Sequence, residues 1–209
     1  MVARLRTLVS GLLLVPALML SIQTLAHAQE KEARGLSDVT VLIVRHAEKP
    51  DQGPLLNAKG EQRAGAYASY FDPLTLNGLP LTPQRLIATS DSPDSSRPRL
   101  TLMPLAQRLQ LPIEQPFADD EVDKLVKSLR KNNQAQTVLI AWHHSRINKL
   151  IAAFGGDGQA LTGQKKWPED VYDWLIVLRF DHQGQLIESG SQKIQEHLLP
   201  GDIAATTGG

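Results

Sequence analysis

Four short runs of aliphatic and β-branched residues are spaced along this chain, and segments of helical periodicity separate them. Such runs are typical of strands that are covered on both faces of a sheet. They occupy residues 39–44, 85–90, 137–142 and 174–180. Between them, apolar residues recur at i, i+3, i+4 and i+7 over residues 64–71, 122–129 and 147–154. This alternation predicts the α/β class, a three-layer α/β/α sandwich with a mostly parallel central sheet, and places a site at the carboxyl ends of the strands.

The last run is followed by a turn-like segment, Asp181-His-Gln-Gly184, and by an alternating stretch over residues 185–191. An alternating stretch directly after a short turn is typical of a β-hairpin. We therefore expect the sheet to end in an antiparallel hairpin built on residues 185–191.

The N-terminal 28 residues have the three parts of a secretory signal. Arg4 and Arg6 precede an apolar run over residues 8–20, and Ala26-His27-Ala28 forms a small-x-small cleavage site. The apolar run is too short for a comfortable membrane span, although an uncleaved anchor is the alternative. The sequence thus predicts a signal peptide over residues 1–28 and a single exported domain over residues 29–209, with flexible tails. The localisation is then periplasmic or secreted, with no membrane attachment after removal of the signal.

Charge and cysteine content exclude several function classes. The 22 basic residues balance the 22 acidic residues, so no bulk positive field favours nucleic acid. Because aromatic residues make up 5% of the chain, no stacking platform for nucleobases is expected. The absence of cysteine removes disulfides and thiolate chemistry. An anionic ligand would have to be bound by a few placed residues.

Two cationic positions follow strands of the predicted sheet. Arg45 and His46 come directly after the first run, where this architecture binds ligands. Arg97 follows the second run and precedes Pro98, a residue suited to the first turn of a helix. At a helix N-terminus the guanidinium and the free N–H groups both favour phosphate. The alternative is a polar strand end without function.

Two adjacent histidines, His143 and His144, follow the third run. Neighbouring side chains on an extended segment point to opposite sides, so only one of them is expected to share a site with His46. A metal site built from these three histidines is a further alternative. Adjacent histidines make poor co-ligands of one tetrahedral ion, and nearby arginines repel a cation, so no metal is predicted.

These motifs, taken in order over residues 39–180, resemble the histidine phosphatase superfamily, also called phosphoglycerate mutase-like. The resemblance is carried by Arg45-His46 with Glu48, by Leu56-Asn57-Ala58-Lys59-Gly60, by Arg97 with Thr101, by a histidine after the 138–142 strand, and by Trp167-Pro168 with Tyr172-Asp173. It implies a phosphoglycerate mutase-like fold and a cofactor-independent phosphatase acting on a small phosphorylated compound. It also implies that His46 forms a phosphohistidine, and that Arg45, Arg97 and a second histidine bind the phosphate.

Two assignments stay open at this stage. Either His143 or His144 supplies the second histidine, and the positions of Trp142 and Ile147 favour His144. The proton donor has no unambiguous match. Asp119, Asp120 and Glu121 are candidates, although acids before a helix also cap it. We interpret Glu48 and Lys49 as a solvated loop pair.

A function from a different class is the alternative. Without a proton donor, the same fold would form a non-catalytic phosphate-binding or scaffold protein, whose ligand would be inorganic phosphate or a phosphorylated compound. A mutase is less expected, because an exported chain of this length has little sequence for a mutase lid.

Overall fold

The computed structural model describes residues 35–202. The predicted signal peptide and the C-terminal tail from residue 204 lie outside the described residues. The elements are, in chain order, β1 (Thr40–Arg45), α2 (Ala58–Tyr70), β2 (Leu74–Leu76), β3 (Leu79–Leu81), β4 (Arg85–Ala88), α3 (Arg97–Leu109), β5 (Ile113–Glu114), α4 (Val122–Asn132), β6 (Thr137–Trp142), α5 (His144–Ala153), α6 (Gly158–Thr162), β7 (Trp174–Arg179), the short 3₁₀ helix η1 (Glu188–Gly190) and β8 (Gln192–Gln195). No helix within this part of the chain is long and apolar enough to cross a membrane.

A mixed sheet with the strand order β5-β4-β6-β1-β7-β8 forms the centre of the molecule. The first four strands in this order run parallel, whereas β7 pairs antiparallel with both β1 and β8. The mostly parallel sheet and the antiparallel pair at its end confirm the predicted fold class. The four predicted strands and the three predicted helices are all present.

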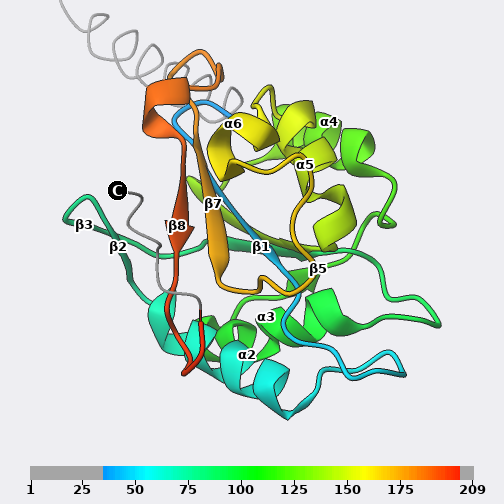
Figure 1. Ribbon diagram of the computed structural model, residues 1–209. Coiled ribbons are helices and arrows are strands. Elements are labelled where there is room, and N and C mark those ends of the chain that lie inside the picture. The colour runs from blue at the N-terminus through cyan, green and yellow to red at the C-terminus, as the bar shows by residue number, and fades with distance from the viewer. Residues whose placement is uncertain (1–34, 203–209) are drawn as a thin grey trace, which may run out of the picture. The chain divides into compact units, whose positions relative to one another are not determined.

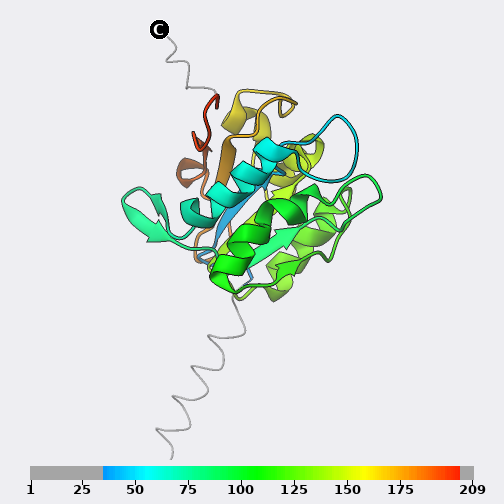
Figure 2. The same cartoon turned by 90° about the horizontal axis from the view of Figure 1, so that it is seen from below.

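Helices cover the sheet on both faces, which gives three layers (Figure 1). Alternate residues of β1 explain this arrangement. Leu42 and Val44 pack in the cluster that includes residues of α2 and α3, and Val41 and Ile43 pack in the cluster that includes residues of α4 and α5. Every second side chain of a strand faces the same layer. A strand such as β1, whose residues 41–44 are all apolar, therefore requires a helical layer on each face of the sheet. In Figure 2, which views the molecule from below, α2 and α3 lie side by side in front of the sheet.

The hairpin at the end of the sheet begins later than predicted. Its second strand is β8, over Gln192–Gln195, and not the alternating stretch 185–191. That stretch contains a single bridge from Leu186 to Phe180 and then η1. The alternating pattern predicted the second strand of the hairpin too early in the chain, because a local pattern does not show where strand pairing resumes. The short strands β2, β3 and β5 were not predicted; β2 and β3 form the hairpin that projects from the body in Figure 2.

Candidate active site

The pairing of two parallel strands brings two histidines together at the carboxyl edge of the sheet. β1 and β6 pair in register up to Arg45 opposite Trp142. The next backbone hydrogen bond runs from His46 N to the Trp142 carbonyl, at 2.9 Å. His143 therefore lies opposite His46, and their ring centroids are 5.1 Å apart in an edge-to-face arrangement.

His144 contacts Arg45, whereas His143 contacts His46. The Nδ1 of His144 is 3.5 Å from Arg45 Nη2. The two adjacent histidines thus contact different residues. The ring contact with His46 is made by His143, whereas the sequence favoured His144 as the second histidine of the site. The physical reason is the strand register, because positions directly after two paired residues face each other.

The His46 ring is buried and held as a neutral imidazole. Its Nδ1 is 2.7 Å from the carbonyl oxygen of Ala47, and because a carbonyl only accepts, Nδ1 carries the proton. The lone pair of Nε2 is thus free. Burial, together with the charges of Arg45 and Arg97, lowers the pKa of His46 to about 2, against the hydrogen bond to Ala47. A neutral ring with a free lone pair is the form that acts as a nucleophile.

Arg45 is fully buried beside His46 and is held by a loop distant in sequence. Its Nη1 donates to the carbonyl oxygens of Pro168, Glu169 and Val171, at 3.2, 2.8 and 2.9 Å. The ring of Tyr172 covers the guanidinium, with Cζ 3.7 Å from the ring centroid. Burial lowers the pKa of Arg45 to about 10, so the group stays charged at neutral pH. Its buried Nε has no hydrogen-bond partner among the described residues.

Arg97 is the first residue of α3, as predicted from the position of Pro98. Its Nη1 donates to the Gly53 carbonyl at 2.8 Å, whereas its buried Nε lacks a partner within residues 35–202. Burial lowers the pKa of Arg97, and the nearby Tyr172 and Asp94 oppose this. The charge of Arg97 in turn lowers the pKa of both His46 and His143. The Nε–H groups of Arg45 and Arg97 thus have no partner among the described residues. Unpaired donors near two imidazoles are what an oxyanion site requires.

A threonine connects the loop after His46 to the helix that carries Arg97. The Thr101 hydroxyl accepts from Ala47 N and donates to the Arg97 carbonyl, both at 2.8 Å. The side chain is fully buried, so these bonds are shielded from water. Thr101 therefore fixes the backbone N–H of Ala47, and the carbonyl of the same residue holds the His46 ring.

The three candidate acids have different surroundings. Asp119 accepts from Arg146 Nε at 3.3 Å, and its second oxygen is buried without a partner among the described residues. Burial lowers the pKa of His143, and the Asp119 charge opposes this. Asp120 is exposed. Glu121 accepts from Ala118 N and pairs with Lys124, and its side chain forms no cap hydrogen bond to α4.

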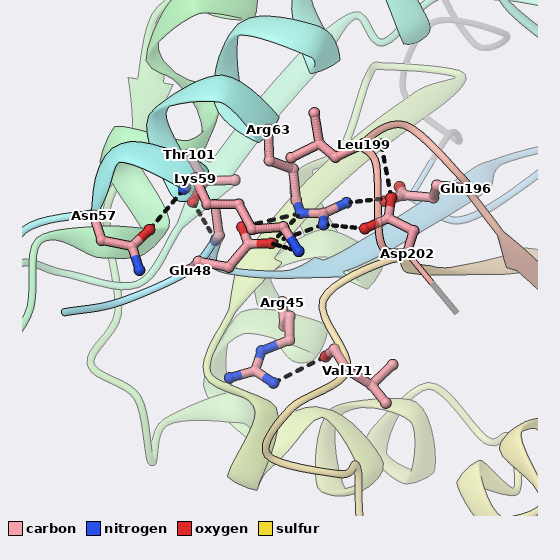
Figure 3. A network of polar contacts seen from close by, with 12 residues as sticks. Arg45, Glu48, Asn57, Lys59, Arg63, Thr101, Val171, Glu196, Leu199 and Asp202 are labelled. Carbon is pink, nitrogen blue, oxygen red and sulfur yellow. Dashed lines mark hydrogen bonds and ion pairs between the residues drawn. The ribbon is translucent and has the colours of Figure 1, made fainter. Parts of the chain in front are cut away.

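Glu48 is not the solvated loop residue that the sequence suggested. It is buried, and its carboxylate accepts from Arg63 Nε and Nη2 (Figure 3). Arg63 also donates to Asp202, at 2.6 and 3.2 Å. The helix bearing Arg63 comes close to this loop because Gly60 has no side chain, since a Cβ there would lie 2.3 Å from the Glu48 carbonyl oxygen. The loop after His46 is thereby tied to the C-terminal segment.

Tyr172 and the carbonyls of residues 168–171 were not predicted as site components. Tyr172 covers Arg45, and its ring centroid is 6.4 Å from that of His46. In the sequence, Tyr172-Asp173 is marked only by the resemblance to the family. Carbonyl ligands leave no signal in side-chain identity, so a sequence cannot reveal them. Within residues 35–202, no group of three or more His, Cys, Asp or Glu side chains is arranged to hold a metal ion.

Solved structures share this fold, although no protein-family model and no curated protein matches the sequence. The alpha-ribazole phosphatase from Shigella flexneri is 13% identical with a TM-score of 0.53, and the match covers 79% of this chain and 100% of that one. A mutant phosphoserine phosphatase from Entamoeba histolytica, solved in complex with phosphoserine, is 14% identical with a TM-score of 0.51, and the match covers 77% of this chain and 100% of that one. The chain therefore has the phosphoglycerate mutase-like fold, as the sequence predicted.

Proposed function

We propose that this protein is a phosphatase that hydrolyses a small phosphate ester through a phosphohistidine on His46. One observation carries the proposal. A neutral imidazole with a free Nε2 lone pair lies beside two arginines, and each arginine has a buried Nε–H without a partner among the described residues. Phosphate oxygens are the acceptors that such donors bind best. The solved proteins of this fold named above are phosphatases, which is consistent with the proposal.

The reaction follows from these positions in two displacements. His46 Nε2 attacks phosphorus and the bond to the ester oxygen breaks, while Arg45, Arg97 and His143 stabilise the phosphoryl oxygens. The leaving oxygen takes a proton from a nearby acid. Water then attacks the phosphohistidine, returns a proton to that acid and releases phosphate and neutral His46. We assign the second histidine to His143, because of its contact with the His46 ring.

We assign the acid to Asp119, because its charge acts on His143 and one of its oxygens is buried without a partner in the described part of the chain. Asp120 and Glu121 stay predictions. A proton donor matters most when the leaving oxygen is a poor leaving group. Asp119→Asn should therefore lower the rate with an alkyl phosphate far more than the rate with p-nitrophenyl phosphate. Asp120→Asn and Glu121→Gln serve as matched controls, and an equal effect of either would move the assignment.

The nucleophile is tested with p-nitrophenyl phosphate in the presence of a chelator. The wild type should release phosphate and form an acid-labile phosphoenzyme. His46→Ala should lose at least about a thousandfold in rate, which corresponds to about 4 kcal/mol of barrier, and keep its circular dichroism spectrum. Binding of phosphate or vanadate without turnover by the wild type would instead indicate a non-catalytic phosphate-binding protein.

We further propose that the protein works outside the cytoplasm. The support is the basic, apolar and small-residue order of residues 1–28. N-terminal sequencing of the protein recovered from its source should begin at Gln29. An intact N-terminus would contradict cleavage.

A further inference from the structure

A cavity of about 570 Å³ opens between the first turns of α5 and the loop over residues 164–169. Its wall includes His144, Ser145, Lys165, Lys166 and Glu169. The cavity is large enough for part of a small metabolite. None of the roles proposed above uses it.

Contacts with Arg45 place this cavity next to the phosphate-binding side of the site. Three of its lining residues touch the Arg45 guanidinium. The Nδ1 of His144 lies 3.5 Å from Nη2, and the carbonyls of Pro168 and Glu169 accept from Nη1. The wall of the cavity is therefore one side chain away from a group that would hold the phosphate.

The loop that carries the two lysines is anchored on both sides. Asn148 Nδ2 donates to the carbonyls of Gln164 and Lys165, at 3.4 and 3.0 Å. Trp167 is buried, donates to the Val171 carbonyl at 2.8 Å and packs against Trp174. A loop fixed in this way presents its side chains with little ordering cost on binding.

The charges on the wall favour an anion. Lys165 and Lys166 are exposed, and neither forms an ion pair with any residue between 35 and 202. Glu169 is the acid on the wall, and His144 is neutral because burial and the Arg45 charge lower its pKa to about 4. Ser145 and Gln164 add neutral hydrogen-bonding groups. The wall of the cavity thus carries two ammonium groups without an ion-pair partner in the described part of the chain, and one carboxylate.

We propose that this cavity binds a second anionic group of the substrate, a carboxylate or a further phosphate, while the phosphate to be cleaved lies at His46. The inference rests on the proposed function and assigns its substrate class: phosphate monoesters that carry another negative charge. Lys165 and Lys166 are then the residues that determine specificity.

The test compares two esters of one polyol, with and without the second anionic group, and includes p-nitrophenyl phosphate as a substrate without one. The double variant Lys165→Ala/Lys166→Ala should lose about tenfold or more in kcat/KM for the doubly charged ester, as expected when charge-assisted contacts are removed. Its kcat/KM for the other two substrates should stay within about twofold. Lys127→Ala/Lys131→Ala removes two exposed lysines of α4 and is the matched control.

Binding separates this inference from the proposed function. Calorimetry with the His46→Ala background measures the affinity of both polyol esters without turnover. If no ester is hydrolysed but the two lysines still strengthen binding of the doubly charged ester, the proposed function fails and the cavity assignment stands. If p-nitrophenyl phosphate is hydrolysed but the double lysine variant leaves the preference between the esters unchanged, the cavity assignment is overturned.

Discussion

His143 and His144 are adjacent in the sequence, but they contact different residues because the register of the paired strands places each position beside its own neighbour. β1 and β6 both have six residues and pair without a bulge, so the first residue after each strand meets the other. The side chain one position further along faces a different neighbour, Arg45. A substitution at His143 and one at His144 should therefore have different chemical consequences, although the residues are adjacent.

Thr101 offers a test of how the His46 ring is held. Thr101→Val keeps the shape of the side chain but removes the acceptor of the Ala47 N–H, which is then buried without a partner. Leaving such a group unpaired costs about 1–3 kcal/mol. We expect a matching loss in the free energy of unfolding by urea denaturation, together with a lower kcat. Thr101→Ser should restore most of both, and wild-type values for the valine variant would show that Thr101 does not position the ring.

At the scale of elements, strands and helices that bury long apolar runs were predictable, and the short elements were not. β1, β6 and β7 were predicted as strands because nearly every residue in them is apolar. α4 was predicted as a helix because Val122, Leu125, Val126 and Leu129 recur at helical spacing, and all four are buried in the structure. β5 has two residues, too few for any periodicity. Arg45, His46 and Arg97 were proposed from the sequence because they lie at or after strand ends in an architecture that gathers strand ends. Their carbonyl partners come from segments with no local signal.

The pairing of α2 with the loop after His46 depends on one buried guanidinium. Hydrogen bonds to Asp202 and Glu48 raise the pKa of Arg63, although burial opposes this. Arg63→Met would leave Asp202 without this cation and Glu48 with Lys59 alone, at 3.8 Å, and breaking such a buried pair costs about 3–5 kcal/mol.

Chemical denaturation of Arg63→Met should reveal this loss. Arg108→Ala removes the exposed partner of Asp72 and should change the unfolding free energy by less than about 1 kcal/mol. Equal effects of the two variants would mean that the buried network adds nothing beyond a surface ion pair.

For the whole molecule, a buried carboxyl group couples stability to pH. Glu196 accepts a hydrogen bond from Tyr67 at 2.8 Å, and its other oxygen has no partner among the described residues. Burial, together with the charges of Asp173 and Asp202, raises the pKa of Glu196 to about 8, and Tyr67 and Arg63 oppose the shift. Between pH 4.5 and 8 the folded protein therefore keeps a proton that the unfolded chain releases, so stability falls as the pH rises through this window.

Glu196→Gln should remove much of this dependence. We expect the wild type to lose on the order of 2 kcal/mol of unfolding free energy from pH 5 to pH 8, and the variant to lose clearly less. Urea denaturation at several pH values provides the measurement. The exposed Glu188→Gln is the control, and parallel curves for wild type and Glu196→Gln would contradict the assignment.

The bond between Asp202 and Arg63 of α2 spans 139 residues of sequence, and the same guanidinium binds Glu48 in the loop after His46 (Figure 3). Arg45, His46, Arg97 and His143 all precede Asp202 in the chain, so a polypeptide synthesised from its amino end contains them before it contains this ion pair. Trimming by a carboxypeptidase to a point before residue 202 would take one of the two carboxylates from Arg63.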